Sequence, residues 1–145
     1  MIALKLIVFN KNYSSWSFRP WIAMKAAGIP FEEEVISLNA DDFKQRVSKI
    51  SGTGKVPALA DGSVQVWESL AILEYLAEKF PAAGLWPADA AIRALARALA
   101  AEMHAGFGPL RPHLAMNMWR PFANRGLSPG VQADGGDNGA ACAVG

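Results

Sequence analysis

The chain has 145 residues, which is enough for one ordinary domain with a buried core and too few for two complete domains. Its 14 Lys and Arg residues against 13 Asp and Glu residues give a formal net charge of +1. The charges are scattered, so the sequence offers no field that would attract nucleic acid or an anionic membrane. A single cysteine, Cys142, excludes an intrachain disulfide, and no apolar run reaches the roughly 18 residues of a membrane span. We therefore expect a cytoplasmic protein that binds neither nucleic acid nor membrane.

The first 80 residues alternate between strand and helix patterns. An apolar run from Leu4 to Phe9 predicts a strand, and a helical pattern beginning at Trp21 stops at Gly28, with Pro20 suited to the first turn. The pattern then predicts a strand over residues 31–37, a polar helix over 41–50, two short strands around an Asp61-Gly62 turn and an amphipathic helix over 68–80. The predicted order is βαβαββα, an α/β domain whose first two strands are parallel.

The second half of the chain changes in character. Residues 81–89, with two prolines and a glycine, predict a linker, and residues 90–120 predict a helix that Pro109 and Pro112 end or kink. One stripe of this helix is apolar: Ile92, Leu95, Ala96, Leu99, Met103 and Phe107. Residues 121–145 predict an irregular, disordered tail, because the helix start at Ser128-Pro129 leads directly into glycine-rich sequence. We expect that a frameshift or early stop produced the residues after about Asp134.

The segment between the first strand and the first helix holds the first candidate chemistry. Ser14, Ser15 and Ser17 lie where free backbone N–H groups and the positive end of a helix dipole converge, and such a place stabilises an anion such as a thiolate. Taken alone, serines there are more often turn or cap residues. His104 and His113 lie far along the chain in the predicted helical region, where a histidine is usually solvated, so a Ser-His-Asp hydrolase is disfavoured.

Two further places could bind a small peptide. Val56-Pro57 is a candidate cis peptide before a short strand, and the Val56 backbone could pair with an extended peptide, although an ordinary trans turn is the commoner case. Glu68-Ser69 begins a helix, where the hydroxyl and the N–H groups would bind a carboxylate and Glu68 would bind an ammonium. The alternative is a plain helix start with an acidic residue. Together the three places describe a site for a peptide with a thiol and an α-amino acid end, and glutathione has both.

The motifs resemble a known family. The segments Ser14-Ser15-Trp16-Ser17-Phe18-Arg19-Pro20-Trp21, Lys55-Val56-Pro57 and 68–76 resemble the N-terminal, thioredoxin-like domain of a bacterial glutathione S-transferase, and the serine pair is similar to the zeta class. Residues 102–107 and Met116-Asn117 continue the likeness into the first helix of an all-α second domain. The resemblance implies a thioredoxin-like domain over residues 1–80 and an incomplete helical domain.

The resemblance also implies roles for individual residues. Ser14 or Ser15 would donate a hydrogen bond to the glutathione sulfur and hold it as a thiolate, with the zeta-like spacing favouring Ser14. Val56 would bind the cysteinyl backbone, and Glu68 with Ser69 the γ-glutamyl end. The same motifs place these further residues in the glutathione site: Ser17, Arg19, Lys55 and Pro57. Glutathione is then a co-substrate, no metal takes part, and a small electrophile lies against the second domain.

The implied activity is glutathione conjugation or glutathione-dependent isomerisation, impaired here by truncation, in a family whose full-length members form homodimers. The alternative is a non-catalytic binding or regulatory module built on the same fold. A thiol-disulfide oxidoreductase would need a cysteine between Ser14 and Ser17, and none is present.

Overall fold

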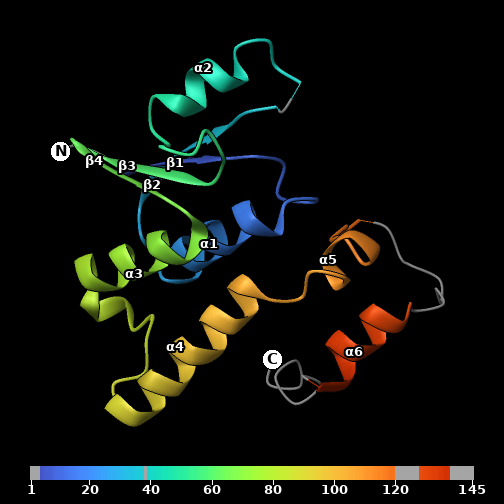
Figure 1. Ribbon diagram of the computed structural model, residues 1–145. Helices are drawn as coiled ribbons and strands as arrows, with labels where there is room; N and C mark the ends of the chain where they lie inside the picture. The colour runs from blue at the N-terminus through green and yellow to red at the C-terminus, as the bar shows by residue number, and fades with distance from the viewer. Residues whose placement is uncertain (1–3, 38, 120–127, 138–145) are drawn as a thin grey trace.

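A computed structural model of the chain describes residues 4–37, 39–119 and 128–137. Four strands form one mixed sheet in the order β2-β1-β3-β4 (Figure 1). β1 (Leu4–Val8) is parallel to β2 (Phe31–Val35) and antiparallel to β3 (Ala58–Asp61), which pairs antiparallel with β4 (Val64–Trp67). Gly62, with φ of 60°, lies in the tight turn between β3 and β4. The predicted α/β class, the βαβαββα order of elements along the chain and the parallel first pair are confirmed.

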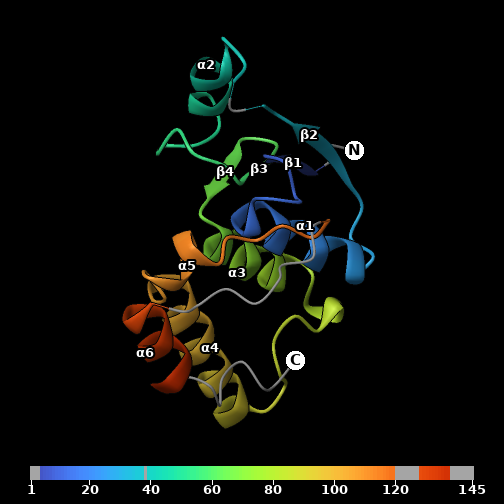
Figure 2. The same cartoon turned by 90° about the vertical axis from the view of Figure 1, so that its right-hand side faces the viewer.

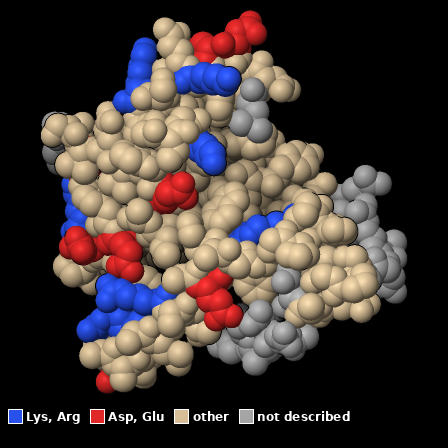
Figure 3. Space-filling model, in the orientation of Figure 1, with Lys and Arg blue, Asp and Glu red and all other residues tan. Residues whose placement is uncertain are grey.

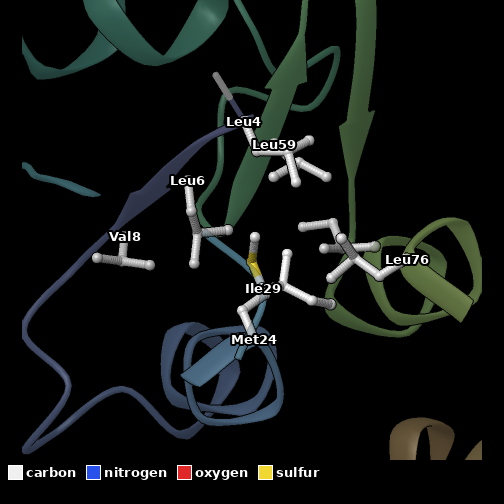
Figure 4. Close-up of a cluster of buried hydrophobic side chains, with 8 residues drawn as sticks. Leu4, Leu6, Val8, Met24, Ile29, Leu59 and Leu76 are labelled. Atoms are coloured by element: carbon white, nitrogen blue, oxygen red, sulfur yellow. The ribbon is translucent and has the colours of Figure 1, made fainter. Parts of the chain in front are cut away.

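Helices cover both faces of the sheet. α1 (Ser15–Ala26) and α3 (Ser69–Lys79) lie side by side on one face, and the short α2 (Phe43–Ser48) covers the other (Figures 1 and 2). The larger core lies between the sheet and the α1–α3 pair (Figure 4) and contains these buried side chains: Leu4, Leu6, Val8, Met24, Ile29, Leu59, Ile72 and Leu76. A smaller cluster of Ile7, Ile36 and Val47 lies under α2. β1 contributes to both clusters, which explains why all of its residues except Lys5 are apolar.

α1 begins earlier than the sequence pattern predicts. We expected Pro20 in the first turn, but α1 starts at Ser15 and Pro20 lies inside it. The prediction was wrong because it followed the apolar pattern from Trp21, whereas the helix is started by Ser14, whose hydroxyl caps the backbone N–H of Ser17 at 3.2 Å. Proline within the helix removes one i to i−4 hydrogen bond. Pro20 is completely buried, and the burial of its apolar ring is a favourable contribution that opposes this loss.

Beyond α3 the chain leaves the sheet. The predicted linker contains a short 3₁₀ helix, η1 (Pro81–Ala83), and leads to α4 (Ala90–Ala105), which lies beyond α3 on the side away from the sheet (Figure 1). α4 ends at Gly106, before the prolines that we expected to end it, and α5 (Leu110–His113) follows, with Pro112 inside it. None of the helices in the described part of the chain is long and apolar enough to cross a membrane.

The tail that we predicted to be irregular contains a helix. α6 (Pro129–Asp137) starts as Ser128-Pro129 indicates, with the Val131 N–H donating to Ser128 Oγ at 3.4 Å. Val131 is buried, and a Cβ added at Gly130 would lie 3.2 Å from Cβ of Pro109. α6 therefore packs closely on the segment that begins α5, and this tertiary contact outweighs the low helix propensity of its glycines. The remaining predicted tail residues, 121–127 and 138–145 with Cys142, lie outside the described residues.

Candidate functional site

One hollow is lined by most of the predicted site residues, and we call it the main hollow. It lies where the start of α1, the segment before β3 and the start of α3 meet α4. Its volume is about 320 Å³, and eight residues line it: Trp16, Thr53, Lys55, Val56, Pro57, Glu68, Ser69 and His104. Five of the seven predicted glutathione contacts are among them, from two segments that are separate in the sequence. The Val56-Pro57 peptide bond is cis, as the sequence indicated. The predicted site residues of these two segments are therefore brought together.

The start of α3 carries two unusual features. Ser69 is the first residue of α3; it is buried, and its hydroxyl has no hydrogen-bond partner among the described residues. Glu68 precedes it in the left-handed region, with φ of 71°, a conformation that costs energy for a residue other than glycine. Its carboxylate is half exposed at the hollow. An unpartnered hydroxyl beside free helix N–H groups can donate hydrogen bonds to an anion, and the carboxylate beside it can bind a cation.

The serines at the start of α1 are placed differently from one another. Ser14 caps the helix, and neither Ser14 nor Ser15 lines the main hollow, although their neighbour Trp16 does. Ser17 is completely buried, and its hydroxyl accepts a hydrogen bond from the Phe9 N–H at 3.0 Å. We predicted Ser17 as a glutathione contact. Ser17 lies in the interior, where it ties the end of β1 to α1, so the structure does not bring it to the main hollow, and its contact with glutathione stays a prediction.

Arg19 also lies outside the main hollow. Its guanidinium lies over the Trp16 ring at 4.2 Å and faces a second, smaller cavity. Burial lowers the pKa of Arg19, and the nearby charge of Arg111 lowers it further. The structure does not bring Arg19 to the main hollow with the other predicted contacts, and its contact with glutathione stays a prediction.

His104 is a member of the site that the sequence did not indicate. Its ring meets the Trp16 ring edge-on, with 5.0 Å between centroids, and its Nε2 lies 3.8 Å from the Glu68 carboxylate. We expected a solvated histidine on a helix surface. Only the packing of α4 beside α1 brings this residue to the hollow, and the available sequence signal was its position in the 102–107 segment that carries the family likeness.

The charges at the hollow suit a zwitterionic ligand. The cationic Lys55 and the anionic Glu68 both line it, and Glu68 immediately precedes the first residue of α3. The residues that the structure describes include no group of three or more acidic, histidine or cysteine side chains that could hold a metal ion.

A further hollow, separate from the cavity at Arg19, has a volume of about 340 Å³ and is lined mainly by apolar groups. It lies between the segment after β1 and the chain that follows α5. Phe18, Trp21, Met118 and Trp119 contribute to its lining. A hydrogen bond of 3.2 Å from Asn12 Nδ2 to Asn117 Oδ1 joins the two segments. The second half of the chain therefore helps to build the surroundings of the α1 start.

Comparisons with known proteins show what this chain is similar to. Residues 13–79 match the family model described as glutathione S-transferase, N-terminal domain. A probable maleylacetoacetate isomerase of Caenorhabditis elegans is 36% identical over 107 residues, covering 73% of this chain and 50% of that protein. A zeta-class glutathione S-transferase of Euphorbia esula is 34% identical over 126 residues, covering 86% of this chain and 54% of that protein.

A solved structure gives the same result. The glutathione transferase homologue from Burkholderia gl BGR1, crystallised with bound glutathione, superimposes with a TM-score of 0.63 at 33% identity, covering 75% of this chain and 57% of that one. The chain spans about half the length of the curated relatives that it matches. Residues 13–79 therefore belong to the family of glutathione S-transferase N-terminal domains.

Proposed function

We propose that this protein binds glutathione in the main hollow and activates its thiol for conjugation to an electrophile or for glutathione-dependent isomerisation. The observation that carries the proposal is the buried, unpartnered Ser69 hydroxyl at the start of α3, beside Glu68 and across the hollow from the cis Val56-Pro57 segment. A buried polar atom without a partner costs free energy unless a ligand satisfies it.

The hollow recognises glutathione by its two charged ends and its backbone. The Ser69 hydroxyl and the first N–H groups of α3 donate hydrogen bonds to the γ-glutamyl carboxylate, and the Glu68 carboxylate accepts from the ammonium of the same α-amino acid group. Val56 pairs through its backbone with the cysteinyl residue, as in strand addition. Lys55 and Pro57 lie on either side of Val56 in the sequence, and Lys55 supplies a positive charge for a carboxylate.

Ser14 is the residue to which we assign thiol activation, with Ser15 as its alternative. Ser14 Oγ accepts the capping hydrogen bond from the Ser17 N–H, so its own O–H remains available to donate to sulfur. A donor at a helix start lowers the pKa of a thiol, which is about 8.5 when unperturbed. The thiolate then attacks the electrophilic carbon, and the electron pair of the broken bond passes to the leaving group or is delocalised within the substrate.

The electrophile, the partner and the location complete the proposal. We place a small electrophile beside the second half of the chain, in a protein that pairs as a homodimer in the cytoplasm. No metal is needed, because the hydroxyl and the helix start supply the stabilisation of the anion.

A second candidate function is binding without catalysis. Neither Ser14 nor Ser15 lines the main hollow, which favours a glutathione-binding or regulatory module in which the thiol is not activated. The two functions share the hollow and differ in the fate of the thiol.

Calorimetric titration with glutathione, together with measurement of thiolate absorbance against pH for the bound ligand, tests both. We expect Glu68→Gln to weaken binding by about 1 to 3 kcal/mol, since a charged hydrogen bond is lost. Glu78→Gln, which changes an α3 carboxylate away from the hollow, is the matched control. Unchanged affinity in Glu68→Gln contradicts the assigned site. Intact binding with an unshifted thiol pKa favours the non-catalytic module.

A further inference from the structure

The second cavity, which Arg19 faces, lies where α1 meets the junction of α4 and α5. Its volume is about 170 Å³, and five residues line it: Arg19, Met103, Phe107, Leu110 and Arg111. Three of them are apolar and two are cations. A cavity of about 150 Å³ with apolar walls is large enough for one benzene ring.

Among the described residues, Arg19 and Arg111 lack the carboxylate partners that two other arginines have. Arg46 pairs with Glu34 and Arg97 with Glu74. Neither Arg19 nor Arg111 forms an ion pair with any carboxylate in the described ranges, and Arg19 Nη1 is buried without a hydrogen-bond partner there. A buried donor of a charged group left unpaired is costly and calls for an anion.

Both guanidinium groups are held in place. They lie over the same ring, that of Trp16, with the Arg19 and Arg111 Cζ atoms at 4.2 Å and 4.6 Å from its centroid. Arg111 also donates to the backbone carbonyls of Met103 and of Gly106, the latter at 3.0 Å from Nε. The repulsion between the two cations is therefore offset by fixed contacts, and their charges add at the cavity. Figure 3 shows basic atoms at the surface near the α4–α5 junction, surrounded mainly by uncharged atoms.

The backbone at this cavity is strained. Phe107, which contributes an apolar wall, has φ of 63°, a left-handed conformation that is unfavourable for an aromatic residue. Strain of this kind persists where the surrounding structure imposes it, and it gathers at binding sites. The turn from α4 into α5 thereby brings an apolar wall and Arg111 to the same cavity.

We propose that this cavity binds a small carboxylate with an apolar body about the size of one aromatic ring. The carboxylate lies between Arg19 and Arg111 and satisfies Arg19 Nη1, while the apolar body contacts Met103, Phe107 and Leu110. The site is distinct from the main hollow, with Trp16 between the cations here and the hollow there, and it does not depend on the function proposed above.

Titration of the 145-residue protein with benzoate and with its neutral counterpart benzamide tests the proposal. We expect saturable benzoate binding and at least about tenfold weaker benzamide binding, because only benzoate pairs with the arginines. Arg19→Gln and Arg111→Gln are each expected to weaken benzoate binding about tenfold or more. Arg93→Gln is the matched control, since Arg93 also donates to backbone carbonyls, those of Pro87 and Ala88, but at the other end of α4.

Four outcomes would overturn the proposal. Three belong to the titrations: equal binding of benzamide and benzoate, equal losses in Arg111→Gln and Arg93→Gln, and the absence of saturable benzoate binding to the unmodified protein. Far-UV circular dichroism confirms that each variant is folded, and an unfolded Arg19→Gln is replaced by Arg19→Lys, which keeps one charge and loses the forked donor. Displacement of benzoate by saturating glutathione would also overturn it, because the cavity would then be part of the glutathione site.

Discussion

The completely buried serines at the starts of two helices, Ser17 and Ser69, have opposite hydrogen-bonding states. Ser17 Oγ accepts from the Phe9 N–H, whereas Ser69 Oγ has no partner among the described residues. A satisfied buried hydroxyl stabilises the fold, while an unsatisfied one is kept at a cost to the folded state. Comparing substitutions of Ser17 and Ser69 therefore distinguishes a hydroxyl that stabilises the fold from a hydroxyl that is available to a ligand.

We predict opposite results for alanine at these two positions. Ser17→Ala is expected to lower the free energy of unfolding by about 1 to 3 kcal/mol, because the Phe9 N–H loses its acceptor. Ser69→Ala is expected to leave it within about 0.5 kcal/mol and to weaken glutathione binding. Urea unfolding and calorimetric titration measure the two quantities. A large loss of stability in Ser69→Ala with unchanged affinity would show that this hydroxyl serves the fold.

Ser14 and Ser15, at the start of α1, are also expected to differ in their effects on stability and on the thiol. Ser14→Ala removes the helix cap, so we predict a loss of about 1 kcal/mol in unfolding free energy. It should also raise the pKa of bound glutathione while affinity stays nearly constant, since the hydroxyl acts on the thiolate.

Ser15→Ala is the control and should change stability and thiol pKa less than Ser14→Ala does. Ser14→Asp adds a second test, because it keeps the cap acceptor but places a negative charge near the sulfur. Restored stability with a thiol pKa at least as high as in Ser14→Ala would separate the two roles. Equal thiol pKa values in wild type, Ser14→Ala and Ser15→Ala would remove both serines from the mechanism.

At the scale of elements, a carboxylate of the β3–β4 hairpin bonds to α3, in addition to the apolar packing between them. Asp61, the last residue of β3, accepts hydrogen bonds from Lys79 and, at 2.5 Å, from the Tyr75 hydroxyl. Both bonds lower the pKa of Asp61 below its usual 3.8, and the bond from Lys79 has the larger effect. The hairpin and the helix that begins with Ser69 are therefore held together by an interaction that depends on pH.

The sign of that dependence follows from linkage. Because the pKa of Asp61 is lower in the folded state, its stabilising contribution is complete above the unfolded value of about 3.8 and is lost as pH falls through the lower folded value. We predict that Asp61→Asn lowers unfolding free energy by on the order of 1 kcal/mol at pH 7 and that this difference shrinks below about pH 4.

Urea unfolding at several pH values measures the effect. Asp41→Asn is the control, because Asp41 is exposed and has no ion pair among the described residues. A difference between wild type and Asp61→Asn that is the same at pH 7 and at acid pH would contradict the assignment.

At the scale of the whole molecule, α4 exposes the apolar stripe that the sequence indicated. Ile92 is 58% exposed, Leu95 61% and Leu99 44%. Burying each such side chain is worth roughly 1.5 to 3 kcal/mol, so a second copy that covers the stripe gains several of these contributions. We predict that the 145-residue chain self-associates through α4.

Sedimentation velocity over a range of concentrations measures the association. Leu95→Lys with Leu99→Lys should raise the dissociation constant by at least about tenfold, the equivalent of ~1.4 kcal/mol, without reducing helicity. Leu114→Lys is the control, since Leu114 is 42% exposed but lies beyond α5. A monomer at every concentration would contradict the prediction.

The sequence by itself determined the elements of the N-terminal half and the segments that form the main hollow. Apolar periodicity and turn residues are local signals, so the βαβαββα order, the Asp61-Gly62 turn and the Val56-Pro57 and Glu68-Ser69 positions could be predicted from neighbouring residues. The start of α1 was misplaced because a buried proline within a helix and a serine cap give weaker local signals than an apolar stripe.

Only the tertiary structure decided which side chains face which cavity. Ser17 faces the interior, Arg19 turns to the second cavity and His104 reaches the main hollow, because these directions depend on how α1 packs against β1 and α4. α6 forms over a glycine-rich segment because Val131 is buried there and Gly130 fits against Pro109. Contacts between residues far apart in sequence leave no periodic pattern along the chain, so their energetic weight could be known only once the packing was known.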